Sequence, residues 1–459
     1  MRAVIETTLL YFVLIAAAIV QLHANLASIE QQNGPLWPRA LLFSLLMFLC
    51  FSAFGLHSGR QRARSAGVIV RIVAAVGLGV VICGIFILLI PDLAIGPGVV
   101  VLAGIGAVAV AAVLHIALGH VIDERVFKAR VLVYGVGRSA EAIAKLRRRA
   151  DRRGFALVGF VAPEGESIGG FLSGEAGVPS KWVLDGAPGL LELCQHHDVD
   201  EIVVAVDDRR RSFPIRELLE CRLAGVDVTE LLSFLERESG RVHIDVLNPS
   251  WIIFGQGYRR GSLRQLSSRA LDLVASVILM VVSLPAMIAT VVAIKLEDGL
   301  RAPVLYRQER VGFGGRIFQL LKFRSMRVDA EASGEARWAV KSDPRVTRVG
   351  ALIRTLRIDE LPQIINVLRG DMSLVGPRPE RPEFVASLSE TIPYYLQRHC
   401  LKPGITGWAQ LCYPYGSSDE DAMEKLQYDL YYIKNNSFLL DLVILVQTAE
   451  VMLFGKGAR

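Results

Sequence analysis

Two adjacent carboxylates, Asp359 and Glu360, lie in a strongly basic part of this 459-residue chain. The basic residues that we single out around the pair are Lys322, Arg324, Arg357 and Arg378. Arg378 stands between two prolines, whose fixed φ angles would hold its guanidinium in one direction, as suits a phosphate ligand. One carboxylate could bind Mg²⁺, which takes few protein oxygens, while the other attacks phosphorus. The pattern therefore indicates phosphoryl-transfer chemistry.

Two apolar stripes at helical spacing, over residues 349–356 and 361–368, flank the carboxylate pair. Pro362 is tolerated only near a helix start, so the pair should lie at a helix N-terminus. A structural alternative is that Asp359 caps this helix and Glu360 interacts with its dipole. For an isolated Asp-Glu pair this alternative would be the more common one.

An apolar segment over residues 270–294 precedes this region and contains Asp272 near its start and Pro285 in its interior. Pro285 would divide the helix into arms of 15 and 9 residues, about 22 and 13 Å long. Neither arm crosses a hydrocarbon core of about 30 Å. Because both flanks are basic, we expect a re-entrant helix-break-helix hairpin over residues 269–295. The alternative is a fifth span, which would put the C-terminal third outside.

The first 120 residues form a separate apolar block. The whole chain is 52% hydrophobic and 21% charged, yet residues 1–120 contain only six Lys and Arg and three Asp and Glu. Four runs of nearly membrane-spanning length predict a helical bundle of four spans, at residues 4–22, 40–55, 68–90 and 99–119. The first run resembles a signal peptide, but Glu6 interrupts it. Three arginines at residues 57–64 place both ends of the block in the cytoplasm.

A Rossmann-like α/β domain is expected over residues 125–245. A strand ending at Tyr134 leads into a G-x-G-x-x-A turn, with Gly135 and Gly137, and then into a helix. Such a turn can hold the pyrophosphate of a dinucleotide. A glycine turn kept for packing is the alternative explanation, and the only candidate acidic residue after the second strand, Glu164, lies beyond a proline. We favour packing over cofactor binding.

Composition excludes several other classes. The net charge of +6 is small and spread along the chain, which does not support nucleic-acid binding. The six cysteines are far apart and have no histidine at metal-ligand spacing, so neither a disulfide scaffold nor a zinc site is indicated.

Several motifs together resemble the bacterial polyprenyl-phosphate hexose-1-phosphate transferases, monotopic phosphoglycosyl transferases that start exopolysaccharide or O-antigen repeat units. They are Arg269-x-x-Asp272, Arg307-Gln308-x-Arg310-Val311-Gly312, Lys322-Phe323-Arg324-Ser325-Met326, Asp343-Pro344-Arg345, Asp359-Glu360-Leu361-Pro362-Gln363, the 366–379 run ending in Pro377-Arg378-Pro379, and Lys402-Pro403-Gly404-Ile405-Thr406-Gly407-x-x-Gln410. The resemblance covers residues 265–455, and the first two domains resemble the large form of the family.

The resemblance implies that Asp359 is the nucleophile and that it attacks the sugar-linked phosphate of a UDP-sugar, most simply UDP-glucose, releasing UMP. Undecaprenyl phosphate would then take the phosphosugar from the aspartyl adduct. Glu360, with Asp359, would hold Mg²⁺. Residues expected to bind substrate or phosphate are Lys322, Arg324, Arg357, Arg378, Gln308, Thr406 and Gln410.

The expected architecture is a four-span block at 1–120, a Rossmann-like domain at 125–245 and a mostly helical monotopic catalytic domain at 262–459. The resemblance places the catalytic domain on the cytoplasmic face of the bacterial inner membrane, where a homodimer is compatible with the sequence. Residues 438–454 are expected to form an interfacial helix, because Asp441 and Glu450 interrupt their apolar character.

Two other functions are alternatives to the transferase. A membrane-tethered NAD-dependent nucleotide-sugar epimerase or dehydratase would centre on Gly135 to Ala140, but its usual Tyr-x-x-x-Lys pair is missing downstream. A non-catalytic scaffold for a polysaccharide machine would not need the ionic side chains gathered in residues 307–410.

Overall fold

The computed structural model divides the chain into two compact units, Met1–Val246 and Leu247–Arg459. It describes residues 2–23, 30–31, 34–54, 56, 65–90, 96–121, 128–144, 146, 155–163, 182–184, 189–207, 213–247, 261–327, 345–413, 416 and 418–454. The arginine-rich loop at 57–64, Glu164, Asp343 and Pro344 lie outside these ranges.

Four apolar helices form a closed bundle in the first unit: α1 (Arg2–Leu22), α3 (Trp37–Ala53), α4 (Ser65–Leu89) and α5 (Pro97–Val121). α1 packs against α3 and α5, and α4 packs against the same two helices. α1, α4 and α5 are long and apolar enough to cross a membrane, whereas α3 has only 17 residues. A side chain at Gly106 would meet Val13 of α1, so glycine permits close helix approach there.

Glu6, the charge that interrupts the first apolar run, has a partner inside this bundle. Its carboxylate Oε1 lies 3.6 Å from Nε2 of His115 on α5, and the side chains of Glu6 and His115 are only 1% and 7% exposed. Charged groups at such depth are costly and are usually paired. The contact joins α1 to α5 within the bundle.

The rest of the first unit contains a five-stranded parallel sheet of order β3-β2-β1-β4-β5. Its strands are β1 (Ala129–Tyr134), β2 (Phe155–Val161), β3 (Val183–Leu184), β4 (Glu201–Val204) and β5 (Asp227–Glu230). Alternate residues of β1 enter opposite cores: Val131 and Val133 face one core, and Leu132 and Tyr134 face the other.

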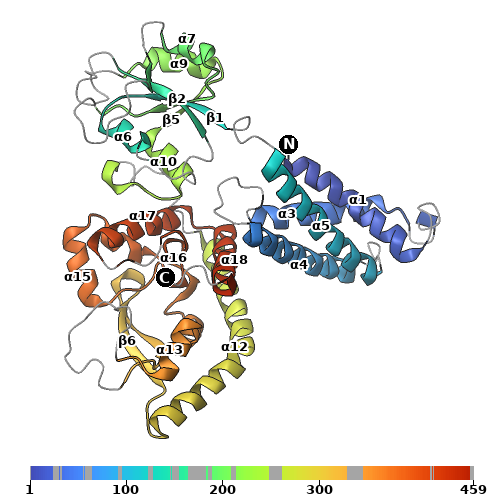
Figure 1. Ribbon diagram of the computed structural model, residues 1–459, viewed down its shortest axis with the longest axis vertical. Coiled ribbons are helices and arrows are strands. Elements are labelled where there is room, and N and C mark those ends of the chain that lie inside the picture. Colours follow the sequence, from blue (N-terminus) through green and yellow to red (C-terminus); the bar gives the residue numbers. More distant parts are fainter. Residues whose placement is uncertain are drawn as a thin grey trace. The chain divides into compact units, whose positions relative to one another are not determined.

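Helices cover both faces of this sheet, as the Rossmann-like expectation requires. α6 (Arg138–Ala144) and α10 (Leu231–Ser239) pack on one face, and α7 (Leu190–His196) and α9 (Ile215–Leu223) pack on the other (Figure 1).

The second unit is largely helical and contains two small sheets. Its helices are α12 (Ser262–Asp298), α13 (Arg348–Thr355), α14 (Gln363–Arg369), α15 (Pro382–Thr391), α16 (Trp408–Cys412), α17 (Asp419–Asn435) and α18 (Phe438–Phe454). β6 (Leu305–Val311) and β7 (Ile317–Phe323) form an antiparallel hairpin, while β8 (Ser373–Val375) and β9 (Gly404–Thr406) pair in parallel.

The break expected at Pro285 does not occur in α12. The helix continues for 37 residues, roughly 55 Å, and is bent along its length (Figure 1). A proline removes one hydrogen bond and costs about 3 kcal/mol, and the intact turns on each side evidently suffice to keep the helix continuous. The two-arm hairpin is therefore not what the structure shows.

Asn366, which is fully buried on α14, fixes this helix against the β hairpin. Its Oδ1 accepts from Leu321 N at 3.0 Å, and its Nδ2 donates to Gln319 O at 2.8 Å. Both backbone partners belong to β7, the strand that carries Lys322. The amide thereby sets the register between Lys322 and the turn just before α14.

Asp441 of α18 is buried rather than exposed at a polar face. Its carboxylate accepts from Arg264 Nη2 and from the Tyr432 hydroxyl, both at 2.7 Å. These contacts tie α18 to the start of α12 and the end of α17. The acidic residue that interrupts this apolar helix thus serves packing within the unit.

Candidate active site

Asp359 and Glu360 lie on a tight 3₁₀ turn, η6 (Ile358–Glu360), between α13 and α14. Arg357, immediately before it, has a φ of 58°, a left-handed conformation that is strained for a long side chain. α14 begins after Pro362 and has no side-chain cap. The alternative in which Asp359 caps this helix is therefore wrong.

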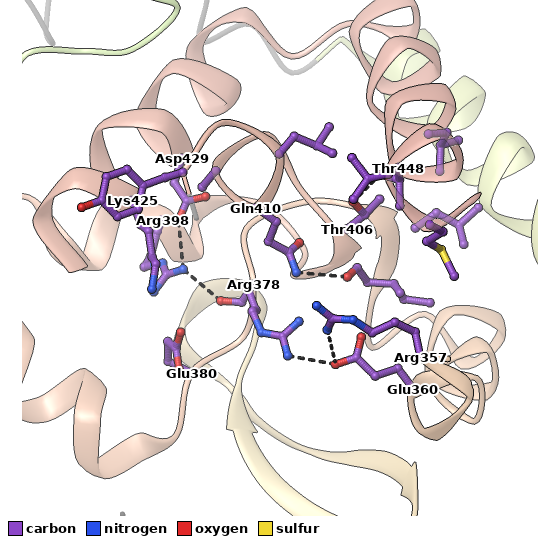
Figure 2. A pocket seen from close by; sticks show the side chains of 18 of the residues that line it. Arg357, Glu360, Arg378, Glu380, Arg398, Thr406, Gln410, Lys425, Asp429 and Thr448 are labelled. Carbon is purple, nitrogen blue, oxygen red and sulfur yellow. Dashed lines mark hydrogen bonds and ion pairs between the residues drawn. The ribbon is translucent and has the colours of Figure 1, made fainter. Parts of the chain in front are cut away.

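Three basic side chains contact Oε1 of Glu360. Arg378 Nη2 is 2.9 Å away, Lys322 Nζ is 3.5 Å away and Arg357 Nη1 is 3.9 Å away. Figure 2 shows Arg357 and Arg378 reaching Glu360 from different elements. The structure thus brings together four of the residues predicted from the sequence, in a cluster suited to an anionic ligand.

The two neighbouring carboxyl groups have opposite pKa shifts. Burial raises the pKa of Asp359, and the negative charge of Glu360 adds to the rise. Burial would also raise the pKa of Glu360, but Arg378 and Lys322 outweigh it and hold that pKa well below its usual range. Asp359 is therefore the more basic and the more nucleophilic carboxylate of the pair.

A cavity of about 560 Å³ opens beside this cluster. Glu360, Arg357 and Arg378 line one part, and Lys425 and Asp429 line another (Figure 2). Much of the remaining wall is apolar; it includes Leu279 of α12 and Leu445, Val451 and Met452 of α18. The cavity can therefore accept a ligand that is charged at one end and apolar elsewhere.

Two predicted phosphate ligands are engaged outside this cluster. Arg324 donates to Asp298 at the end of α12 over 2.6 Å, and the arginine is only 7% exposed. Gln308 accepts from Arg310 Nη2 at 2.6 Å. The first contact ties the residue that follows β7 to the end of α12, whereas the second lies within β6.

Thr406 and Gln410, two of the residues expected to bind substrate, line the cavity, and each has a defined hydrogen-bonding arrangement. The Thr406 hydroxyl lies 2.6 Å from that of Thr448, which itself donates to Ile444 O, so Thr406 donates to Thr448. Gln410 Nε2 donates to Ile405 O at 3.4 Å, while its Oε1 is buried without a hydrogen-bond partner among the described residues. A buried lone acceptor calls for a ligand donor rather than a phosphate.

Arg398 and Asp429 also line the cavity, and the sequence analysis missed both. They form a buried ion pair of 2.9 Å. A signal was present, because Asp429 falls among Leu426, Leu430 and Ile433, which form an apolar stripe on α17. A carboxylate on a buried helix face requires a partner.

The carboxylates of Asp359 and Glu360 are the candidate ligands for a metal ion at this site. Within the described ranges, no three His, Cys, Asp or Glu side chains gather into a ready cation site. Asp359 and Glu360 nevertheless match the coordination preference of Mg²⁺. This ion usually binds one or two protein carboxylates and completes its coordination shell with phosphate oxygens and water. The pair fits a cation that arrives with its phosphate ligand.

In the first unit, the side chain of Asp207 occupies the N–H groups that follow the glycine turn. Backbone N–H groups of Arg138 and Ser139, at the start of α6, donate to the Asp207 carboxylate at 2.8 and 2.9 Å. A side chain at Gly137 would collide with that carboxylate. Because a dinucleotide pyrophosphate would need these same N–H groups, the arrangement favours the packing explanation of Gly135 and Gly137.

Comparison with known proteins agrees with the site. The model of the bacterial sugar transferase family matches residues 263–455. The UDP-glucose:undecaprenyl-phosphate glucose-1-phosphate transferase of Caulobacter vibrioides is 42% identical over 195 residues, which are 42% of this chain and 72% of the relative. The chain therefore belongs to the bacterial sugar transferase family.

Two longer alignments include part of the first unit. The UDP-N-acetylgalactosamine-undecaprenyl-phosphate N-acetylgalactosaminephosphotransferase of Aeromonas hydrophila is 44% identical over 244 residues, 53% of this chain and 56% of the relative. The undecaprenyl-phosphate glucose phosphotransferase of Komagataeibacter xylinus is 35% identical over 337 residues, 72% of this chain and 60% of the relative. The chain thus spans somewhat more than half the length of these two relatives.

Proposed function

We propose that the protein transfers a sugar 1-phosphate from a UDP-sugar to undecaprenyl phosphate and releases UMP. The observation that carries this proposal is a pair of adjacent carboxyl groups at the edge of a partly apolar cavity. Asp359 is buried, and Lys322, Arg357 and Arg378 converge on its neighbour, Glu360. The cations suit a diphosphate, and the apolar wall suits a polyprenyl chain.

In the first step, an Asp359 oxygen attacks the sugar-linked phosphorus. The bond from this phosphorus to the bridging oxygen breaks, and UMP leaves with that oxygen. In the second step, an oxygen of undecaprenyl phosphate attacks the same phosphorus, and Asp359 is released as a carboxylate. Such covalent catalysis divides one difficult displacement into two easier ones.

The cluster around Glu360 would stabilise charge that develops on the transferred phosphate and on UMP. Arg378 and Arg357 line the cavity and would turn from Glu360 toward the diphosphate. Glu360 and Asp359 would hold Mg²⁺, which when bound would neutralise phosphate charge. The lone acceptor of Gln410 would receive a hydroxyl or imide N–H of the nucleotide sugar.

The sugar is proposed to be glucose, with N-acetylgalactosamine as the main competitor, because relatives named for both sugars match the chain. Purified protein in detergent should be incubated with undecaprenyl phosphate, Mg²⁺ and each of several UDP-sugars. We expect UMP and an undecaprenyl diphosphate sugar from at least one of them. Formation of neither product from any UDP-sugar would refute the proposed function.

We further propose that α12 enters and leaves the membrane on one side, the cytoplasmic one. Its first half is tied to the catalytic unit by Arg269, which donates to Val367 O and Leu368 O. Asp272, in the same half, accepts from Ser373 and Leu374. At its other end, Glu297 accepts from the first N–H groups of α13. A helix held at both ends by one unit is poorly suited to span a bilayer.

The surface between these two attachments is apolar. Val274, Val277, Ile278, Val281 and Val282 of α12 are all exposed. Contiguous exposed apolar residues of this extent indicate contact with lipid or another apolar surface. The bend along α12 (Figure 1), rather than a break, would let the helix dip into one leaflet.

Cysteine labelling tests this topology. Leu263, at the start of α12, and Leu300, two residues past its end, are both exposed. Leu263→Cys and Leu300→Cys should react with an impermeant maleimide from the same side of sealed vesicles. The variants would be made without the native cysteines, and Val281→Cys in the apolar middle should resist labelling. Reaction of the two end positions from opposite sides would show that α12 spans the membrane.

The pKa shifts predict how the first step depends on pH. Only the ionised Asp359 attacks, and burial raises its pKa above the usual 3.8, so UMP release should fall on acidification with a midpoint above that value. Arg354 lowers this pKa, and Arg354→Gln should therefore move the midpoint to higher pH. The measurement is the pH profile of UMP release in single turnover.

A matched variant controls for general charge effects. Arg316→Gln removes an exposed charge at the turn between β6 and β7 and should leave the midpoint unchanged. A downward shift for Arg354→Gln, or an equal shift for both variants, would contradict the assignment of the acidic limb to Asp359.

A further inference from the structure

The segment around Arg378 is held by its carbonyl groups. Its two prolines have no N–H to donate, yet four successive carbonyl oxygens each accept a hydrogen bond of 2.9–3.0 Å. The donors, in chain order from Pro377 O to Glu380 O, are Gly404 N, Arg398 Nη2, Arg310 Nη1 and Val311 N. Two of these four donors are arginine side chains.

Arg398 is the donor to Arg378 itself. Its Nη2 lies 2.9 Å from Arg378 O and also 2.9 Å from Asp429 Oδ2, and its Nη1 donates to the Tyr395 hydroxyl at 2.7 Å. Arg398 and Asp429 are 7% and 2% exposed. One buried guanidinium thus connects α17 to the backbone that carries Arg378.

The hydrogen bond from Arg398 to Arg378 O bears on the direction in which the Arg378 side chain points. Because Pro379 follows it, Arg378 is restricted to extended backbone conformations. Within that range, the direction of the Arg378 carbonyl depends on the ψ angle of Arg378. Anchoring that oxygen fixes where the Cα–Cβ bond points. The Arg378 side chain then reaches Glu360 with a 2.9 Å contact.

We propose that Arg398, held by Asp429, is a positioning residue that directs Arg378 toward the transferred phosphate. The inference rests on the proposed transfer reaction. Stability alone does not account for this pair, because replacing a buried ion pair by apolar residues of similar volume is often neutral or stabilising. The additional hydrogen bond to Arg378 O gives the pair a role that apolar residues could not fill.

The test separates folding from positioning. Arg398→Met alone leaves the Asp429 carboxylate buried without its partner, and we expect both a lower Tm and slower UMP release. In the double variant Arg398→Met/Asp429→Leu the Tm should recover, while UMP release should stay about 100-fold below wild type, as displacements near 1 Å can cost. Recovery of the rate together with the Tm would overturn the proposal.

A second experiment tests whether the loss of Arg398 slows UMP release through Arg378. In an Arg378→Gln protein, adding Arg398→Met/Asp429→Leu should slow UMP release by no more than about threefold, because residues that act as one unit are not additive. A further 100-fold loss would show that Arg398 acts elsewhere.

Arg398→Lys serves if the double variant does not fold. The ammonium can still pair with Asp429 but lacks the planar fork that reaches Arg378 O and Tyr395 together, so the rate should fall about tenfold at nearly unchanged Tm. An unchanged rate would overturn the proposal. Failure of the proposed function itself would be distinct, because wild-type protein would then release no UMP from any UDP-sugar.

Discussion

Asp359→Asn should reduce sugar-phosphate transfer at least about 1,000-fold, since removing a covalent nucleophile costs 10⁴-fold or more in well-studied enzymes. The amide has the size of the carboxylate but cannot form the aspartyl phosphate. Because burial already disfavours the charged form of Asp359, the neutral amide should not lower the Tm. Transfer is measured as undecaprenyl diphosphate sugar formed per enzyme per minute.

Glu360→Gln is the matched control for this change. It removes the neighbouring carboxylate, frees Lys322, Arg357 and Arg378 from their shared partner and leaves the nucleophile in place. We expect a smaller loss, about 10- to 100-fold, because Glu360 acts indirectly, by orienting the three cations and helping to hold Mg²⁺. Loss confined to Glu360→Gln, with Asp359→Asn near wild type, would reverse the two roles.

Arg378→Gln should reduce UMP release about 100- to 1,000-fold, the usual cost of losing one preorganised charge at a reacting centre. Arg378 donates to Glu360 over 2.9 Å and lines the cavity, so it is placed to stabilise charge on the departing phosphate. Single-turnover UMP release at saturating UDP-sugar measures this effect apart from acceptor binding.

Arg381→Gln is the control within the same segment. Its guanidinium lies 3.7 Å from the exposed carboxylate of Glu383, and Arg381 is not among the described residues that line the cavity. Its loss should therefore change the rate by no more than about threefold. Equal losses for the two arginines would indicate a general electrostatic effect instead of a specific contact by Arg378.

Much of the site could be predicted because its chemistry is local in sequence. Asp359, Glu360 and Pro362 lie in one short turn, and the prolines on either side of Arg378 restrict its backbone locally. The strand ending at Tyr134 and the glycine turn after it likewise predicted a Rossmann-like α/β domain, and the sheet found there has helices on both faces. These features depend on backbone geometry within a few residues.

The features that the sequence did not predict depend on distant partners. Arg324 carries the same charge as Arg378, but only the fold shows that Asp298 engages it. The closure of the glycine turn by Asp207 could not be anticipated either, because that residue lies beyond β4. The continuity of α12 through Pro285 reflects the balance of many helical hydrogen bonds against one that is lost.

The covalent intermediate is the central claim, and intact-protein mass spectrometry tests it most directly. Purified protein would be mixed with a UDP-sugar and Mg²⁺ in the absence of undecaprenyl phosphate, so that any adduct accumulates. We predict a gain in mass equal to one sugar phosphate on the wild-type protein, lost when undecaprenyl phosphate is added, and no gain on Asp359→Asn. No adduct on a wild-type protein that completes the transfer, or an adduct that persists in Asp359→Asn, would contradict the account.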